Sequence, residues 1–413
     1  MKTDTFNQQE IEKIVDRAFP GEEARALNYR LNRYSKDKVG FLGTHQNLEI
    51  TVKRRGSNQS EILRFFVKSL PTLTEEQLKF IRERDLFGQE ASYFNDVLPV
   101  LKKACPSTDD WSPRCFLATD KLVVLEDMRL RNYAMSDTKM LSEEQLKAAF
   151  RAQARLHAAS LVAEKQLAKP LNQAYPKSCG EAIFNDGMLE SKRLQLYTDL
   201  AERVAERLGR DGRRISAGFR KGFDQMYDQN QLSTRLPKVL EHGDAWPNNY
   251  LFDESDPPKC VLVDFQLTRY GPPTYDLLLL AYLSTNRQTR EKVIGEAIEA
   301  YHAQFCKVLE QNNPEIERPS LDDVLEEYEQ LRTTALLCAV MYYPVIWVGQ
   351  STIDKYDEEE RYKRLMFRQD NSFVMQIYDE DEIFAEKMNE VIIETVEYFE
   401  QRDVPIEMNN DLH

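Results

Sequence analysis

The feature that most constrains this chain is the stretch 241–266, EHGDAWPNNYLFDESDPPKCVLVDFQ. It contains a polar His-Gly-Asp turn ending at Asp244, followed by two short apolar runs at 250–252 and 260–263. The residues between the two runs are rich in Asp and Pro, which break strands and favour turns. The stretch therefore predicts two short strands that pair as an antiparallel hairpin.

The expected hairpin brings polar side chains together. We expect Phe252 to pair with Val261, which places Asn249 opposite Asp264, with Asp244 on the loop just before them. Hard oxygen ligands of this kind hold Mg²⁺ on phosphate groups, and a separate carboxylate can accept the proton of an attacking hydroxyl. The pattern predicts phosphoryl transfer from ATP, with Asn249 and Asp264 as metal ligands and Asp244 as the base. The alternative is a surface turn followed by an ordinary hairpin.

Two stretches carry a family resemblance. HGDAWPNN and VLVDFQLTRYGPPTYDLLLL resemble the ecdysteroid kinase-like branch of the choline kinase and aminoglycoside phosphotransferase group. The resemblance implies an α+β, protein-kinase-like fold of two lobes, with a small antiparallel sheet lobe and a larger, mainly helical lobe. It also implies an enzyme that phosphorylates hydroxyl groups of small molecules. We expect a nucleotide-binding lobe at 1–128 and a catalytic and acceptor-binding lobe at 129–413.

The first lobe is expected to begin with an amphipathic helical region at 7–30 and to continue with strands at 48–53 and 62–68. Gly40 and Gly43 stand just before the first of these strands. Glycine allows backbone N–H groups to approach phosphates, so this turn is a candidate loop over the ATP phosphates. A plain hairpin turn is the alternative.

A lysine and a glutamate are candidates for an ion pair at the nucleotide. Lys68 closes an apolar strand, and Glu90 lies among apolar residues of one helix expected between Thr74 and Pro99. A carboxylate that faces the interior needs a cation. The resemblance implies that the lysine holds the ATP phosphates and that the glutamate positions it. The alternatives are a lysine at the sheet edge and an exposed glutamate.

Residues 121–128 are typical of an apolar strand that runs into two acids. By its place in the order of elements, this segment resembles the hinge between the two lobes. Main-chain groups around Glu126, Asp127 and Met128 would then bind adenine, and the side chains of Leu125 and Met128 would pack on the base. The alternative is an ordinary edge strand.

Three polar residues of the second lobe are interpreted as support for the site. His157 and His242 are expected to be scaffold histidines. Asp276 opens a very apolar helix, and it either caps that helix or accepts hydrogen bonds from the loop at 242–244. The segment 266–273 is too short for a long regulatory loop, which favours a small-molecule acceptor over a protein substrate.

The acceptor itself is suggested by the resemblance alone, which points to an ecdysteroid or a related sterol alcohol. A choline-like or aminoglycoside-like acceptor stays open, because an acidic protein suits a cation. A pseudokinase that binds ligand without turnover also stays open, because the glycine turn is unusual. The sequence indicates no oligomeric state.

The composition restricts which partners and which cellular compartment we expect. The formal charge of −14 argues against nucleic acid or an anionic membrane as a partner. The N-terminus lacks the apolar core of a signal peptide, and the longest apolar run, 335–348, falls short of the ~20 residues that span a bilayer. The six cysteines are scattered, with no C-x-x-C pair. We therefore expect a cytoplasmic protein with free thiols.

Overall fold

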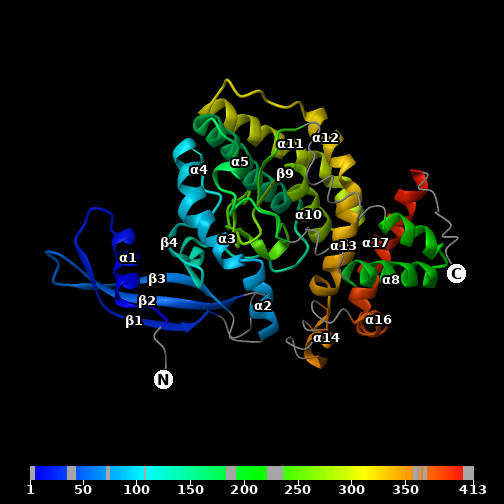
Figure 1. Ribbon diagram of the computed structural model, residues 1–413, viewed down its shortest axis with the longest axis horizontal. Helices are drawn as coiled ribbons and strands as arrows, with labels where there is room; N and C mark the ends of the chain where they lie inside the picture. The colour runs from blue at the N-terminus through cyan, green and yellow to red at the C-terminus, as the bar shows by residue number, and fades with distance from the viewer. Residues whose placement is uncertain are drawn as a thin grey trace.

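A five-stranded antiparallel sheet forms one end of the molecule, and helices make up most of the rest (Figure 1). The strand order is β1-β2-β3-β5-β4. The strands are β1 (Ala24–Arg33), β2 (Thr44–Arg54), β3 (Ser60–Ser69), β4 (Cys115–Ala118) and β5 (Leu122–Glu126). The structure is a computed structural model that describes residues 5–34, 43–70, 75–106, 108–182, 192–220, 236–356, 361, 364–365 and 370–402.

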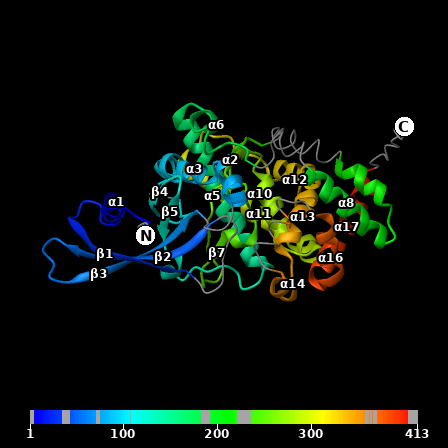
Figure 2. The same cartoon turned by 60° about the horizontal axis from the view of Figure 1, so that its bottom comes forward.

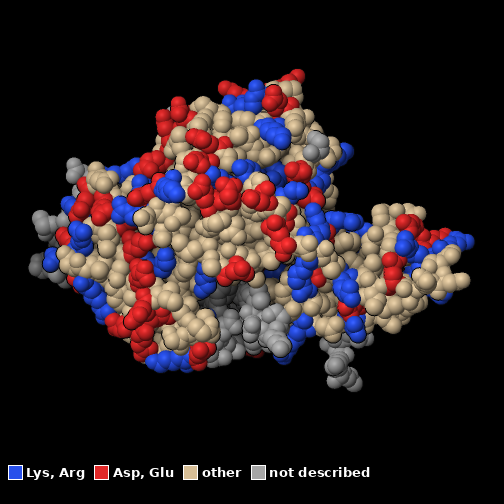
Figure 3. Space-filling view, turned by 180° about the vertical axis from the view of Figure 1, so that it is seen from behind, with Lys and Arg blue, Asp and Glu red and all other residues tan. Residues whose placement is uncertain are grey.

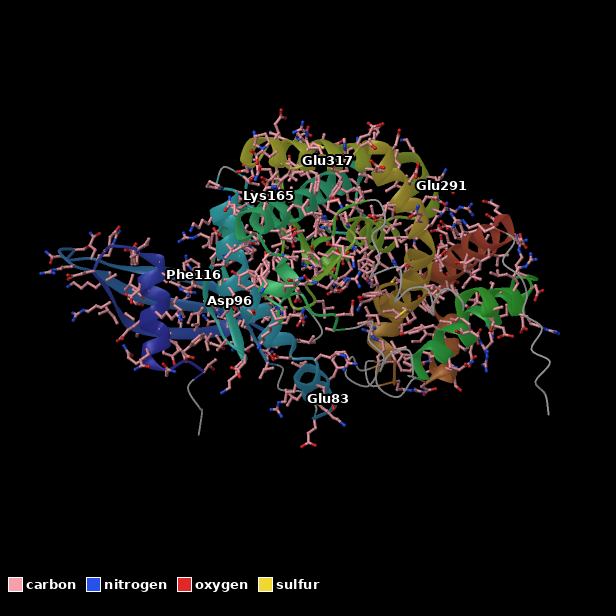
Figure 4. All side chains as sticks on the ribbon, turned by 45° about the horizontal axis from the view of Figure 1, so that its top comes forward. Glu83, Asp96, Phe116, Lys165, Glu291 and Glu317 are labelled. Atoms are coloured by element: carbon pink, nitrogen blue, oxygen red, sulfur yellow. The ribbon has the colours of Figure 1, made fainter. Side chains whose placement is uncertain are left out.

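Helix α1 (Gln8–Ala18) covers one face of this sheet. Its N-terminus is closed by a capping box, in which Asn7 and Glu10 each accept a backbone N–H of the other. The apolar side of α1 is buried on inward-facing residues of β2 to β5, and Phe116 of β4 lies beside it (Figure 4). This small core is separate from the main one, and it fixes which face of the sheet is left for the site.

The helix expected at 7–30 is wrong beyond Ala18, because residues 24–33 form strand β1. The residues of β1 that pack on the small core are Ala24, Ala26, Tyr29 and Leu31. A bulge between Ala26 and Asn28 shifts the pairing with β2, so two inward-facing residues stand three positions apart. That spacing imitates the period of a helix, which explains the error.

The single helix expected between Thr74 and Pro99 is also wrong. The segment is divided into α2 (Glu75–Glu83), α3 (Leu86–Ser92), the π-helical turn η1 (Tyr93–Val97) and α4 (Leu98–Ala104). Asp85 stands between α2 and α3 with a left-handed backbone, φ 49°, which ends the first helix. Pro99 lies in the first turn of α4, where no intrahelical N–H is required. Glu83 points outward at the end of α2 (Figure 4).

The helical lobe is built around two buried helices. Helix α5 (Glu143–Leu167) begins at a capping box of Ser142 and Gln145, and α10 (Thr274–Ser284) is buried along its whole length. The other helices are η2 (Met128–Arg131), α6 (Leu171–Ala174), α8 (Lys192–Arg207), α11 (Arg287–Asn312), α12 (Leu321–Gln330), α13 (Arg332–Ile346), α14 (Gln350–Lys355), α16 (Asn371–Glu380) and α17 (Glu382–Gln401). Of these, α8, α16 and α17 gather at the end farthest from the sheet (Figure 2).

Two short antiparallel pairs lie within this lobe. Strand β6 (Val239–Glu241) pairs with β9 (Arg269–Gly271), and the predicted hairpin is β7 (Tyr250–Phe252) with β8 (Cys260–Leu262). The turn η3 (Pro247–Asn249) leads into the hairpin. These pairs fix the ends of the loop that carries Asp244.

The expected α+β, two-lobed, protein-kinase-like fold is confirmed. The chain leaves the sheet after β5 and enters the helices through η2, whereas the division into 1–128 and 129–413 stays a prediction. The segment 91–105 packs in the main core with the helices. In the described part of the chain, no helix is long and apolar enough to cross a membrane.

Candidate active site

Lys68 is the centre of a buried ion cluster. It lies near the end of β3, and the residue is only 4% exposed. Its Nζ lies 2.9 Å from Glu90 Oε2 on α3 and 2.5 Å from Asp264 Oδ1, which follows β8. Burial lowers the pKa of Lys68, but the carboxylates of Asp264 and Glu90 outweigh that effect and raise it. The predicted contact of Lys68 with Glu90 is therefore present, and Asp264 joins it.

Glu90 ties this cluster to the backbone that follows Asp264. Its second oxygen, Oε1, accepts the N–H of Phe265 at 3.1 Å. The Phe265 ring stacks on Tyr93 of the same helical segment, with ring centroids 4.1 Å apart. The residue expected to position Lys68 thus fixes both the lysine and the segment that carries Asp264.

The hairpin pairs one residue away from the expected register. Leu251 and not Phe252 lies opposite Val261, and the N–H of Val263 donates to the carbonyl oxygen of Asn249 at 3.0 Å. Asn249 therefore faces Val263, and Asp264 lies one residue farther along. Both faces of these short strands are largely buried, so the apolar pattern does not distinguish registers that differ by one residue.

Asp264 has an uncommon backbone. Its φ of 68° is in the left-handed region, which few residues with a Cβ adopt. Its side chain contacts Lys68, and it is close enough to Asp244 that its charge raises the pKa of that residue. The turn of the chain at Asp264 thus places one carboxylate between the lysine of the sheet and the loop of the helical lobe.

Helix α10 holds the loop 242–244 in place. Asp276 is fully buried and accepts the N–H of His242 at 2.6 Å and the N–H of Gly243 at 3.0 Å. Gly243 has φ 78°, and a Cβ there would lie 1.9 Å from the carbonyl oxygen of Leu267. Only glycine fits this turn, and of the two roles considered for Asp276 the structure supports the one in which it holds the loop.

Both histidines near the loop have structural partners. His157 Nε2 lies 3.2 Å from Asp276 Oδ2, and its Nδ1 lies 3.0 Å from the hydroxyl of Tyr301. His242 Nε2 lies 2.9 Å from the carbonyl oxygen of Val263, and burial lowers the pKa of His242. Each ring thus bridges separate segments of the helical lobe, as expected of scaffold residues.

Asp244 projects from this loop beside Asn249. The Asn249 Nδ2 group donates to Asp244 Oδ2 at 3.0 Å and to the Asp244 carbonyl oxygen at 2.8 Å. Burial, and then the charge of Asp264, raise the pKa of Asp244 to about 7, while the hydrogen bond from Asn249 opposes the rise. A carboxyl group that titrates near neutral pH is suited to accept a proton from a substrate hydroxyl.

The two residues predicted to bind a metal, Asn249 and Asp264, contact different side chains of the site. Asn249 contacts Asp244, and Asp264 contacts Lys68, so each candidate ligand has a protein partner here. Among the residues that the structure describes, no three His, Cys, Asp or Glu side chains are grouped as a metal site on their own. One amide and one carboxylate suit Mg²⁺ that takes its remaining ligands from phosphate and water.

The expected glycine turn is described only in part. Gly40 lies outside the described residues. Gly43 lies against Lys68, and a Cβ at Gly43 would come within 3.0 Å of the lysine Cγ. The absence of a side chain at Gly43 therefore leaves room for the lysine, which is a role that the sequence did not suggest.

The hinge segment lies between the sheet and η2. Leu125 is opposite Phe66 in the sheet and is buried, and Met128 packs beside Val261. The N–H of Glu126 donates to the carbonyl oxygen of Arg114 at 2.9 Å, so this main-chain group already has a partner. Binding of adenine by the segment of Leu125, Glu126, Asp127 and Met128 stays a prediction.

An aromatic and polar group on the same face of the sheet was missed from the sequence. His45 pairs with Lys68 across β2 and β3, and its ring centroid lies 5.1 Å from that of Phe66. Tyr34 stacks edge-on with Phe66 at 4.9 Å, and the Arg129 guanidinium covers the Tyr34 ring at 4.1 Å. Alternation along β3 puts Phe66 on the face of Lys68, which is the signal that could have found this group.

A tyrosine of the C-terminal helices also reaches the site. The hydroxyl of Tyr342, on α13, lies 3.5 Å from Asp244 Oδ1. The apolar pattern of 335–348 predicts the buried helix, but nothing in it points to a residue nearly 100 positions earlier. A contact of this range depends on the tertiary packing of α13.

The comparisons with known proteins agree with the resemblance of the sequence. A model of the ecdysteroid kinase-like family matches residues 40–313. That range includes Lys68, Glu90, Asp244, Asn249 and Asp264, and it ends just after α11. A comparison with curated proteins gives no match.

Among solved structures, the chain is similar to an ethanolamine kinase of Plasmodium vivax and to a macrolide 2'-phosphotransferase of Brachybacterium faecium. The first is 13% identical with a TM-score of 0.40, over 83% of this chain and 81% of that chain. The second is 14% identical with a TM-score of 0.34, over 87% of this chain and 98% of that chain.

Proposed function

This chain belongs to the ecdysteroid kinase-like family, and we propose on that premise that it is an ATP- and Mg²⁺-dependent kinase of small molecules. The reaction transfers the γ-phosphoryl group of ATP to an acceptor hydroxyl. The observation that carries the proposal is the contact of Lys68 with both Glu90 and Asp264. A buried lysine shared by two carboxylates, with Asp244 close by, is what phosphate positioning and proton transfer require.

In this proposal each residue has one role. Lys68, positioned by Glu90, binds phosphate oxygens, and Asn249 and Asp264 hold Mg²⁺, which neutralises phosphate charge when bound. Asp244 accepts the proton of the acceptor hydroxyl as the new O–P bond forms. The bond between the γ-phosphorus and its bridging oxygen breaks, and ADP leaves.

In the same proposal, the adenine ring of ATP binds at the hinge segment. The segment of Leu125, Glu126, Asp127 and Met128 supplies main-chain and apolar contacts to adenine, and Gly40 and Gly43 belong to the loop over the phosphates. Phe66, opposite Leu125 in the sheet, adds an aromatic surface beside the segment. Stacking of a base on such a ring is worth about 1–3 kcal/mol in nucleic-acid-binding proteins.

For the acceptor, the family description favours an ecdysteroid or a related sterol alcohol. A choline-like or aminoglycoside-like alcohol is the alternative substrate class, and a pseudokinase is the alternative without turnover. Turnover of a sterol alcohol, of a cationic alcohol or of neither separates the three in one acceptor screen.

Partners and location form part of the proposal. We propose a small-molecule acceptor, with neither nucleic acid nor a membrane as a partner, because the charge of −14 repels polyanions. On the face in Figure 3, Asp and Glu are spread widely and Lys and Arg lie among them. All six cysteines are free thiols, which supports a reducing, cytoplasmic location.

The decisive test replaces the proposed base. We expect Asp244→Asn to lower kcat by about 10²–10⁴-fold, because the general base is lost while the amide keeps the shape of the side chain. Mg-ATP binding by calorimetry should persist, since Lys68 and Asp264 are untouched. Asp379→Asn is the matched control, because Asp379 is an exposed acid that pairs with Arg207 on the surface. Full turnover by Asp244→Asn would refute the assignment of Asp244 as the base. If the wild-type protein binds Mg-ATP but turns over no acceptor, the result would favour a pseudokinase.

A further inference from the structure

A helix beyond the matched family region contributes to the site. Helix α13 (Arg332–Ile346) lies beyond residue 313, where the family match ends. Its Tyr342 donates a hydrogen bond from its hydroxyl to Asp244 Oδ1, with the two oxygens 3.5 Å apart. The side chain expected to act as base is thus contacted by a part of the chain that the family model does not cover.

The position of α13 is fixed by contacts with two other helices. The next residue, Tyr343, donates from its hydroxyl to the carbonyl oxygen of Tyr282 on α10 at 2.9 Å. Arg332, at the start of α13, donates to the hydroxyl of Tyr282 at 2.9 Å and pairs with Glu394 of α17 at 3.2 Å. Because α10 also carries Asp276, one buried helix fixes both the loop of Asp244 and the helix of Tyr342.

Two different elements contact the two carboxylate oxygens of Asp244. Oδ2 accepts from Asn249, which belongs to the hairpin, at 3.0 Å, and Oδ1 faces Tyr342. A carboxylate with a donor on one oxygen can still rotate about its side-chain torsions, whereas donors on both oxygens restrict it to one orientation. The long distance of 3.5 Å indicates a weak hydrogen bond.

Tyr342 acts here as a hydrogen-bond donor and not as a charged group. Burial, and then the charge of Asp244, raise its pKa well above the ordinary value, so the phenol keeps its proton. One turn earlier on α13, Cys338 is fully buried in the main core. The phenol therefore keeps its proton, which it donates in the hydrogen bond to Asp244.

We propose that Tyr342 is a positioning residue, which fixes the Asp244 carboxylate in the orientation that accepts the proton of the acceptor hydroxyl. The inference rests on the proposed kinase function and extends it to a residue outside the matched region. Because Tyr342 contacts the base and not the residues that hold nucleotide, it acts on the catalytic step and leaves ATP binding unchanged.

The test compares two adjacent tyrosines. In Tyr342→Phe we expect kcat to fall about 5- to 10-fold, the size of one weak charge-assisted hydrogen bond, with KM for ATP and the Kd for Mg-ATP unchanged. In Tyr343→Phe, which loses a bond to the backbone of α10 and none to Asp244, we expect a lower Tm and an unchanged kcat. Equal losses of kcat in both variants, or a kcat for Tyr342→Phe within twofold of wild type, would overturn the inference.

A second measurement separates this inference from the proposed function. Crystal structures of both variants are expected to show the Asp244 carboxylate rotated or in two conformers in Tyr342→Phe only. If the wild-type protein phosphorylates no acceptor but Asp244 still moves in this way, the kinase function fails and the positioning contact stands. If the wild type turns over and Asp244 keeps one orientation in Tyr342→Phe, the kinase function stands and the inference is wrong.

Discussion

A single ammonium group, on Lys68, contacts two carboxylates that come from different parts of the chain. Glu90 belongs to α3, whereas Asp264 follows β8 and stands 196 residues after Lys68. Removal of one partner from a buried ion pair typically costs about 3–5 kcal/mol, because the remaining charge is left without compensation. The ion pairs of Lys68 with Glu90 and Asp264 therefore also join the sheet lobe to the helical lobe.

His45 gives the site a pH dependence of its own. Burial, and then the charge of Lys68, lower the pKa of His45 from 6.5 to about 4. As the pH falls below 6.5 the unfolded chain takes up this proton before the folded protein does, so stability is lost between pH 6.5 and about 4. We expect this residue to account for up to about 3 kcal/mol of that loss.

Urea unfolding of wild type and His45→Gln at pH 7.5 and pH 4.5 measures this contribution. Other groups titrate equally in the two proteins, so their effects cancel in the comparison. The variant should lose less stability on acidification than the wild type does. Identical losses in the two proteins would contradict a neutral, buried imidazole at this position.

At the scale of the element, the loop of Asp244 is held by its supports and not by its own residues. Asp276 accepts hydrogen bonds from two successive backbone N–H groups of the loop and lies 3.2 Å from His157 Nε2. Burial alone would raise the pKa of Asp276, but the contact with His157 lowers it, so the group stays ionised. A charged acceptor inside the helical lobe thus fixes the direction in which Asp244 points.

Replacement of that acceptor tests the arrangement. In Asp276→Asn one oxygen becomes an NH₂ group that faces the donors of the loop, which leaves a buried N–H without an acceptor. We expect a loss of about 2–4 kcal/mol in the free energy of unfolding, together with reduced kcat. Urea titrations give the first quantity, and Asp379→Asn, a surface acid, should stay within about 0.5 kcal/mol of wild type. A stable, fully active Asp276→Asn would show that the loop needs no such support.

The elements also explain what the sequence could and could not predict. The sequence places Asp244, Asn249 and Asp264 close together because the chemistry of a turn and of two short strands is local, and their roles stay predictions. Lys68 and Glu90 were found because buried charges need partners. The register of β7 on β8 was missed by one residue because both faces of these strands are largely buried.

The remaining errors concern the periodicity of apolar residues and contacts between residues far apart in the sequence, and they have other causes. The bulge in β1 imitated a helical spacing, and the left-handed Asp85 broke a helix whose apolar pattern continues across it. Tyr342 was missed because its contact with Asp244 depends on how α13 packs on α10. Such contacts are decided by tertiary structure, which local patterns do not contain.

At the scale of the whole molecule, the C-terminal helices belong to the same folding unit as the site. Helix α10 is buried along its length, and α12 and α13 pack against it. Glu394 of α17 pairs with Arg290 of α11 and with Arg332 of α13, and it also accepts from Tyr282 of α10. The segment beyond residue 313 therefore covers the core that supports Asp276 and brings Tyr342 to Asp244.

A truncated chain tests this dependence. A chain that ends at Asn313 keeps the whole family match but loses α12 to α17, so the apolar side chains of α10 become exposed. Each large apolar side chain that loses its cover costs about 1.5–3 kcal/mol, and several together exceed the 5–15 kcal/mol that stabilises a typical domain. We expect this chain to show no cooperative unfolding by circular dichroism and to bind a hydrophobic dye, in contrast to the full-length protein. Cooperative unfolding and Mg-ATP binding by the chain that ends at Asn313 would mean that the C-terminal helices form a separate unit, and the contact of Tyr342 with Asp244 would then be dispensable for the fold.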